Sequence, residues 1–176
     1  EVDMATAEAV IVGGGVMGSS ILYNLAVRGV TDTILLEQNA LASGSTSKSQ
    51  AILRMHYSNE VTTRMAWESL RVFKEFEEIT GGPSGYVRTG YVLIAGESDR
   101  GALEKNVALG RRLGVDTKVV SAADVREIAP VMSVRDDEAF AYEPESGYAD
   151  TYTVTTGYAR RARELGAQVR VETTVT

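Results

Sequence analysis

The sequence has 176 residues, enough for a domain with its own core, and carries 18 basic against 24 acidic residues. A formal net charge of −6 disfavours nucleic acid as a partner, because phosphate binding normally requires a basic excess. The absence of cysteine excludes disulfides and cysteine-ligated metals, and the single histidine, His56, excludes a histidine-cluster metal site. No apolar run approaches the roughly 20 residues of a membrane-spanning helix, and the acidic start does not resemble a leader. We therefore expect a cytoplasmic protein without a metal site.

The first forty residues predict a βαβ unit. Residues 9–12 form an apolar run typical of a buried parallel strand, and residues 33–37 form a second one. Between them, residues 16–28 place apolar side chains at helical spacing and are followed by Gly29. Two strands and a helix within about thirty residues indicate a right-handed crossover. The small, hydroxyl-rich stretch 42–49 that follows is by itself typical of a surface loop.

The middle of the chain mixes strands and helices without this rhythm. A long amphipathic helix is expected at 60–79, with Val61 and Met65 on its apolar face, and it ends at Gly81-Gly82-Pro83. The further expected elements are a strand at 86–95, a helix from a cap at Ser98 to Leu113, a strand at 118–120, a short helix capped by Ser121, and a strand at 139–142. A helix from about 150 to 165 and a strand at 167–176 complete the prediction.

This pattern predicts a discontinuous first domain. Residues 1–82 and 144–176 carry the α/β elements, and residues 83–143 interrupt them as an insertion. Strands of parallel sheets are normally covered on both faces, whereas nothing in the sequence follows the strand expected at 167–176. We therefore expect the chain to be the front part of a longer protein.

Gly13-Gly14-Gly15-Val16-Met17-Gly18 has the G-x-G-x-x-G spacing, directly after a strand and at the start of a helix. In a dinucleotide site Gly13 permits the tight turn, Gly15 lets the backbone approach a pyrophosphate, and Gly18 lets helix and strand pack closely. The helix N-terminus, at Val16 and Met17, then offers N–H groups to phosphate. The alternative is an ordinary strand–helix turn.

An acidic residue ends the next strand. Glu37 lies nineteen residues after Gly18, where a carboxylate is expected to accept the ribose hydroxyls of the nucleotide. Such a carboxylate repels a 2′-phosphate, so NAD or FAD is favoured over NADP. Gln38, the following residue, is a further candidate contact.

Three stretches in this order resemble the FAD-dependent D-amino-acid oxidase superfamily, in its branch of sarcosine oxidase, glycine oxidase and dimethylglycine dehydrogenase. They are residues 10–20 (VIVGGGVMGSS), 36–37 (LE) and 44–49 (GSTSKS). Residues 89–95 and 143–150 are similar to the segments that enter and leave the family's substrate domain. The resemblance implies an FAD-binding, Rossmann-like α/β domain of the glutathione-reductase type, interrupted by part of a mixed α+β substrate domain. Family members are longer than this chain.

The resemblance also implies roles for the hydroxyl-rich loop. In the family this loop lies beside the flavin and the pyrophosphate, which makes candidate contacts of Ser43, Ser45, Thr46 and Ser47. Lys48 stands where dimethylglycine dehydrogenase-like members carry the histidine that bonds covalently to flavin, so we expect non-covalent FAD. Lys48 is either a positive charge near the flavin or a solvated loop lysine. In the family the backbone after the last strand contacts adenine, which makes a candidate contact of Val175 near the end of this chain.

Residues 52–57 (ILRMHY) resemble the sarcosine oxidase stretch in which an arginine binds the substrate carboxylate. By this resemblance Arg54 binds the substrate, since a guanidinium matches a carboxylate with two parallel hydrogen bonds. The alternative is a structural ion pair. Some sarcosine oxidases carry a second arginine at the position of Ala51, so the substrate is left open. His56 is assigned no catalytic role.

The resemblance implies an enzyme that oxidises the C–N bond of a small amino acid or N-methyl amino acid, with hydride transfer to FAD. The expected partners are an amino-acid-like substrate and oxygen or an electron carrier, and the oligomeric state is left open. Two alternatives are an NAD-dependent Rossmann dehydrogenase and a non-catalytic FAD-binding subunit of a larger complex.

Overall fold

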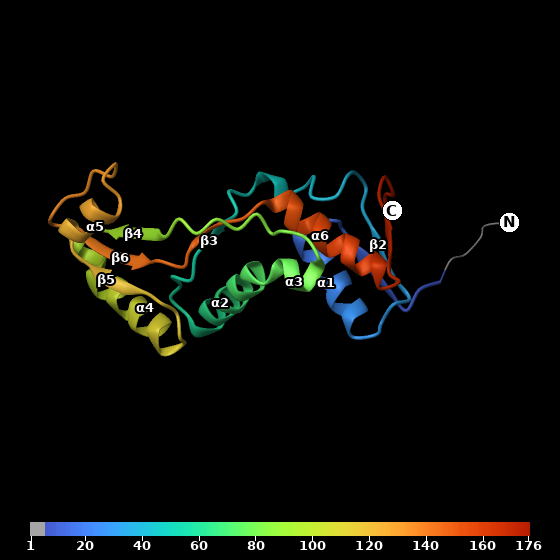
Figure 1. The fold of residues 1–176 in the computed structure, drawn as a ribbon, viewed down its shortest axis with the longest axis horizontal. Helices are drawn as coiled ribbons and strands as arrows, with labels where there is room; N and C mark the ends of the chain where they lie inside the picture. Colours follow the sequence, from blue (N-terminus) through green and yellow to red (C-terminus); the bar gives the residue numbers. More distant parts are fainter. Residues whose placement is uncertain (1–5) are drawn as a thin grey trace. The chain divides into compact units, whose positions relative to one another are not determined.

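The computed structural model describes residues 6–176, which divide into two compact units (Figure 1). Unit 1 runs through Ala51 and adds Lys74–Tyr86 and Ala149–Thr176. Unit 2 comprises Ile52–Phe73 and Val87–Tyr148. The segment Ile52–Phe73 thus packs with the inserted residues. The assignment of 1–82 and 144–176 to an FAD-binding domain, and of 83–143 to a substrate domain, stays a prediction.

Unit 1 contains a parallel sheet of three strands in the order β1-β2-β8. Strand β1 (Ala9–Val12) lies beside β2 (Thr33–Leu36), which pairs on its other side with β8 (Gln168–Arg170). The predicted βαβ unit is confirmed, since helix α1 (Val16–Val27) connects β1 to β2. The last strand is shorter than predicted, because the backbone turns at Glu172, whose φ is +53°.

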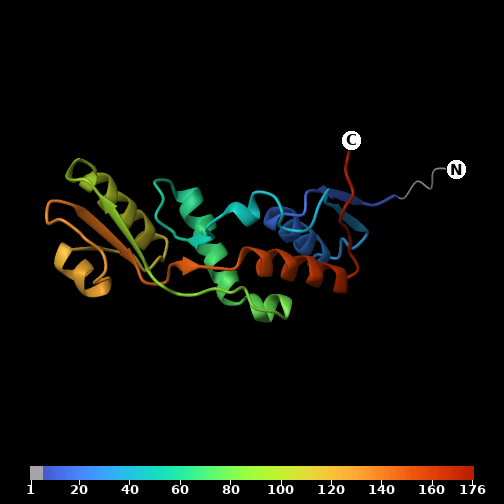
Figure 2. The same ribbon diagram turned by 90° about the horizontal axis from the view of Figure 1, so that it is seen from above.

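Two helices cover one face of this sheet (Figure 2). Helix α1 and helix α6 (Thr151–Glu164) contact each other along their length. Their apolar side chains and those of the sheet form one core of Leu22, Ala26, Leu35, Ala162 and Ala167. The side chains of Val10 and Val12 alternate to the other face of β1 and are exposed.

The helix predicted at 60–79 is interrupted at Glu75. Helix α2 (Glu60–Lys74) ends there, and the short helix α3 (Phe76–Thr80) begins one residue later. The boundary between the units falls here, and Phe76 packs edge-on against Tyr158 of α6 within unit 1, with ring centroids 4.9 Å apart. The apolar pattern could not show that the two ends of this stretch pack in different units.

The predicted apolar face of this helix was also partly wrong. Val61 and Met65 are exposed, whereas Leu70 and Thr63 are the buried residues of α2. Gly81 ends α3 in the left-handed conformation, as expected.

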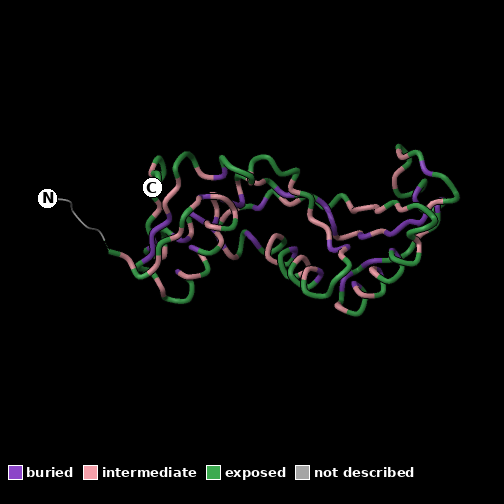
Figure 3. The backbone as a smooth tube through the Cα atoms, turned by 180° about the vertical axis from the view of Figure 1, so that it is seen from behind, coloured by how far each residue is buried: buried purple, intermediate pink, exposed green. Residues whose placement is uncertain are grey.

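Unit 2 is built on an antiparallel sheet in the order β4-β6-β5. The central strand β6 (Ala139–Glu143) pairs with β4 (Tyr91–Ala95) and with β5 (Lys118–Val120). Figure 3 shows the burial of the central strand, of which every residue except Tyr142 is buried.

Helices cover both faces of this sheet. Helix α4 (Arg100–Arg112) packs through Leu103 and Val107 on Ala139 and Ala141. Helix α5 (Ala122–Ile128) packs through Val125 on Phe140, which points to the opposite face. The capping box predicted at Ser121 is confirmed, with Asp124 as its partner. The cap predicted at Ser98 was wrong, because Ser98 lies within the 3₁₀ turn η2 (Glu97–Asp99).

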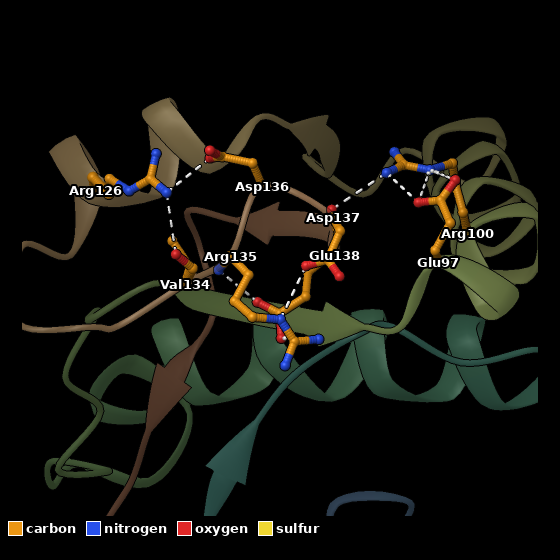
Figure 4. A network of polar contacts seen from close by, with 8 residues as sticks. All are labelled: Glu97, Arg100, Arg126, Val134, Arg135, Asp136, Asp137 and Glu138. Carbon is orange, nitrogen blue, oxygen red and sulfur yellow. Dashed lines mark hydrogen bonds and ion pairs between the residues drawn. The ribbon is translucent and has the colours of Figure 1, made fainter.

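Arginine side chains tie the loop before β6 to its surroundings (Figure 4). Arg126 of α5 bonds the carbonyl of Val134 and the carboxylate of Asp136, at 3.1 and 2.8 Å. Arg100 of α4 donates to the carbonyl of Glu138. The two bonds to backbone carbonyls are partly buried and hold the loop in place, whereas the Arg126–Asp136 ion pair is exposed and contributes little stability.

A pair of two-residue strands was not predicted. Strand β3 (Ile52–Leu53) pairs antiparallel with β7 (Gly147–Tyr148) in unit 2. This pairing joins residues almost a hundred positions apart, and strands this short leave no periodic signal. The mixed α/β class is as expected, and the glutathione-reductase type stays a prediction. Among the described residues, no helix is long and apolar enough to cross a membrane.

Candidate functional site

The glycine turn between β1 and α1 has the geometry that the sequence predicts. Gly13 adopts φ +107°, which side chains other than hydrogen rarely permit, and its N–H donates to the carbonyl of Leu36. A Cβ at Gly18 would overlap the carbonyl oxygen of Gly13. The turn is therefore closed by backbone against backbone, and the close approach requires glycine at position 18.

The N-terminus of α1 is suited to an anion. Its first turn carries no acidic side chain, and its N-cap residue, Gly15, has no side chain to cap it. The first N–H groups of a helix have no acceptor within the helix and form the positive end of its dipole. Met17, in this first turn, is exposed. These are the features by which helix N-termini bind phosphate.

Thr46 brings the hydroxyl-rich loop to this turn. Its Oγ1 accepts a hydrogen bond from the N–H of Val16 at 3.0 Å. The loop is held further by the N–H of Ala42, which donates to the carbonyl of Gly14 at 2.9 Å. Of the four hydroxyl residues predicted as contacts, Thr46 is the one the structure joins to the glycine turn by a hydrogen bond.

The other predicted loop residues are exposed. Ser43 and Ser45 are at the surface, and the hydroxyl of Ser47 donates to the carbonyl of Gly44 at 3.1 Å. Lys48 ends the short 3₁₀ turn η1 (Thr46–Lys48) and is also exposed, with no ion pair among the described residues. Their roles beside a cofactor stay predictions.

The carboxylate of Glu37 is held by backbone on both oxygens. Oε2 accepts from the N–H of Gly14 at 2.7 Å, and Oε1 accepts from the N–H of Asn39 at 2.8 Å. A carboxylate offers about four acceptor positions, so each oxygen can still accept a ribose hydroxyl. The N–H of Gly14 thus orients the acid against the glycine turn, as a dinucleotide site requires.

The remaining candidate contacts to the nucleotide, Gln38 and Val175, belong to the two segments that meet at Glu37. Gln38 is exposed. Beyond β8 the chain returns along Glu37, where the N–H of Thr173 donates to the Glu37 carbonyl at 2.9 Å. Val175 follows two residues later and is about half exposed. The glycine turn, the helix N-terminus and an oriented carboxylate therefore fit a dinucleotide within unit 1.

Arg54 belongs to unit 2 and follows β3. Its guanidinium lies 4.5 Å from the centre of the Tyr57 ring, and its Nη1 donates to the carbonyl of His56 at 2.6 Å. Among the described residues it forms no ion pair, so the alternative of a structural ion pair is not supported by these contacts. A half-buried guanidinium stacked on an aromatic ring, with its other donors free, is suited to binding a carboxylate.

His56 is 7% exposed and lies 3.2 Å, through Nε2, from the amide nitrogen of Asn106. Burial, and then the charge of Arg54, lowers the pKa of the imidazole. The ring is therefore neutral at pH 7. Nδ1 has no partner among the described residues.

Glu143 is a site residue that the sequence did not predict. It is 2% exposed, and its Oε2 accepts from the N–H of Met55 and from the hydroxyl of Ser146, each at 2.8 Å. Burial raises the pKa of this carboxyl, whereas the N–H of Met55, the Ser146 hydroxyl and the charge of Arg54 lower it. The available signal was an acidic residue directly after the apolar run 139–142.

The parallel sheet, the glycine turn and the oriented carboxylate define an α/β dinucleotide-binding protein. The particular family follows from comparison with known proteins. Residues 8–176 match the family described as FAD dependent oxidoreductase (DAO), and the chain belongs to this family. This confirms the resemblance stated from the sequence.

Individual relatives align with most of this chain. A regulatory subunit of pyruvate dehydrogenase phosphatase from Mus musculus is 34% identical over 97% of it, and sarcosine dehydrogenase from Homo sapiens is 34% identical over 94%. The solved structure of L-proline dehydrogenase from P. horikoshii superposes with a TM-score of 0.89, at 28% identity over 97% of this chain. The chain covers 20%, 18% and 45% of these three proteins, respectively.

Proposed function

We propose that this chain forms the nucleotide-binding part and a portion of the substrate site of an FAD-dependent enzyme. The enzyme oxidises the C–N bond of a small amino acid or N-methyl amino acid. Two observations carry the proposal, each within its own unit: the cofactor-type turn of unit 1, and in unit 2 an Arg54 that stacks on Tyr57 and has no ion pair among the described residues. Family membership supports FAD over NAD as the dinucleotide.

The residues of unit 1 would hold the adenine-nucleotide portion of FAD. The N-terminus of α1 binds the pyrophosphate, and Glu37 accepts the ribose hydroxyls. Thr46 and the loop serines supply neutral hydroxyls, which bind phosphate without adding a fixed charge. Gln38 and Val175 lie beside the ribose and adenine. We assign the domain to the glutathione-reductase type, with residues 83–143 as part of the substrate domain.

Arg54 would bind the carboxylate of the substrate. Sarcosine and L-proline, named in two of the relatives, are both amino acids with a secondary amine and a carboxylate. The stack on Tyr57 and the bond to the His56 carbonyl hold the guanidinium in place before substrate arrives. A preorganised cation costs little ordering entropy on binding, so it fixes the orientation of the substrate.

The bound flavin supplies the acceptor for the hydride of the substrate C–H bond. Arg54 orients the substrate through its carboxylate, and its positive charge balances the negative charge of that carboxylate. The buried imidazole of His56, whose pKa is lowered by burial and then by the charge of Arg54, adds no second positive charge near Arg54. Lys48 would be a further cation near the flavin. Oxygen or an electron carrier then reoxidises the flavin.

The residues of this chain favour non-covalent binding of FAD. The sequence has no cysteine, and its one histidine, His56, lies in unit 2, bonded to Asn106. Unit 1 itself therefore contributes no thiol or imidazole. Acid precipitation of the purified protein is expected to release the flavin into the supernatant, and yellow precipitate would contradict this.

The experiment is anaerobic mixing of the full-length, FAD-loaded protein with sarcosine, glycine, proline and glycerol 3-phosphate in turn. We expect an amino acid to bleach the flavin absorbance. A protein without flavin absorbance would overturn the FAD assignment, and failure of every compound to bleach bound flavin would favour a non-catalytic subunit. A phosphate ester that bleaches flavin in place of the amino acids would overturn the substrate class.

Arg54→Met tests the role of the arginine. Loss of a guanidinium–carboxylate pair is expected to raise the KM of the active amino acid about 100-fold. The matched control is Arg64→Met, because Arg64 is exposed on α2 and pairs with Glu60 in the neighbouring turn. Unchanged KM in Arg54→Met, with flavin content equal to the control, would contradict carboxylate binding by Arg54.

A further inference from the structure

The buried carboxylate of Glu143 is not used by any step described above. Glutamate is rarely buried unless its charge is compensated, because moving a carboxylate out of water is costly. Glu143 ends β6 at the centre of the antiparallel sheet and is 2% exposed. Because its burial is costly and it lies next to the segment that carries Arg54, we asked what the Glu143 carboxylate does there.

Glu143 contacts the segment that follows β3 and, in addition, Ser146. The β3–β7 ladder has only two residue pairs and ends at Leu53. Met55, two residues on, is 1% exposed, so its N–H would lack an acceptor if Glu143 were absent. Oε2 of Glu143 accepts this N–H at 2.8 Å. The side chain thus supplies the acceptor that a neighbouring strand would supply if the ladder extended to Met55.

The segment held in this way contains both anchor points of Arg54. Met55 lies between Arg54 and His56, and the His56 carbonyl accepts the Nη1–H of Arg54 at 2.6 Å. Fixing the backbone at Met55 therefore fixes the arginine's own Cα and the carbonyl that orients its guanidinium. The Ser146 hydroxyl, 2.8 Å from Oε2, in turn fixes the Glu143 carboxylate.

We propose that Glu143 is a positioning residue for Arg54, and through it for the carboxylate of the substrate. The proposal rests on the proposed function, in which Arg54 binds that carboxylate. Glu143 touches neither substrate nor flavin in this scheme. It acts by holding the Met55 N–H, so its removal loosens the guanidinium without removing it.

The test compares Glu143→Leu with Glu143→Gln in the full-length, FAD-loaded protein. Leucine has similar volume but no acceptor, whereas glutamine retains an oxygen for the Met55 N–H. We expect Glu143→Leu to raise about tenfold both the KM of the active amino acid and the dissociation constant of acetate, read from the flavin spectrum. Glu143→Gln should restore both values to near those of the wild type, with little change in kcat throughout.

A double-mutant cycle separates positioning from general structural damage. In the Arg54→Met background, Glu143→Leu should change neither the KM nor the acetate affinity further. Equal effects of Glu143→Leu in both backgrounds, or no rescue by glutamine, would overturn the proposal. Should Glu143→Leu fail to fold, Glu143→Asp takes its place, because a shorter side chain withdraws the acceptor from Met55 and predicts the same pattern.

Glu145→Leu is the matched control. Glu145 lies two residues away and pairs with Arg88 at 2.8 Å. Its removal should leave KM and acetate affinity unchanged. If Arg54→Met itself leaves both values unchanged, the carboxylate role of Arg54 and the positioning role of Glu143 fall together. If Arg54→Met raises them and Glu143→Leu does not, only the role of Glu143 fails.

Discussion

The two candidate regions of this molecule are built in different ways. The glycine turn of unit 1 lies within a single βαβ unit, and its shape is set by backbone clearances such as that between Gly13 and Gly18. The Arg54 region of unit 2 joins residues 88 positions apart, since Glu143 bonds the N–H of Met55. Local backbone sterics are readable in sequence, whereas a polar contact between distant strands depends on the fold that brings them together.

The largest expected effect belongs to the glycine turn. Gly18→Ala places a Cβ against the Gly13 carbonyl, which is backbone and cannot rotate away. We expect a loss of about 1–3 kcal/mol in the free energy of unfolding, together with loss of bound FAD. Denaturant unfolding and the ratio of flavin to protein absorbance after desalting measure the two.

The control for this substitution is Gly44→Ala. Gly44 has open space where a Cβ would stand, and it is not in the left-handed region. Its substitution should change stability by less than about 0.5 kcal/mol. Comparable losses in both variants would show that the loss in Gly18→Ala does not come from the close approach of Gly18 to the Gly13 carbonyl.

A pH dependence tests the long-range contact of unit 2. Because burial raises the pKa of Glu143, the folded chain holds its proton more tightly than the unfolded chain does. The free energy of unfolding therefore falls as pH rises above 4.5, the ordinary pKa of a glutamate, and stops falling once pH has passed the raised pKa of Glu143 in the folded chain. Glu143→Gln does not titrate, so its stability relative to the wild type should increase from pH 4 to pH 7.

The measurement is denaturant unfolding of both proteins at several pH values. Titratable groups far from Glu143 have the same pKa in the wild type and in Glu143→Gln, so their contributions cancel in the difference between the two unfolding free energies. The charged or titratable groups beside Glu143 are Arg54 and His56, and the pKa of His56 is itself lowered, by burial and then by Arg54. A stability difference that does not vary with pH would show that Glu143 is not strained by its burial.

The smallest expected effect concerns a local feature of unit 2. Ser121→Ala removes the hydroxyl that accepts the N–H of Asp124 at 3.1 Å and should cost about 1 kcal/mol. Ser98→Ala is the matched control, because Ser98 caps no helix, and should cost less than about 0.5 kcal/mol. Equal costs in the two variants would mean that the Ser121 capping box adds no specific stability. This local pattern, unlike the glycine turn, would then have little effect on the fold.

The sequence by itself determined the features whose cause lies within a few residues. The βαβ unit, the glycine turn, the acid at the end of β2 and the Ser121 cap all follow from local spacing and backbone sterics. Arg54 was identified by resemblance alone, and its role stays a proposal. The residues around it carry no local pattern that marks a site.

Only the tertiary structure decided the rest. It divided the helix predicted at 60–79, because Phe76 packs on Tyr158 while α2 belongs to unit 2. It bonded Thr46, rather than its serine neighbours, to the N–H of Val16. It also buried Glu143 beside Met55, through the pairing of β3 with β7. Each of these depends on which distant segments meet, and periodicity along one segment holds no information about its partner.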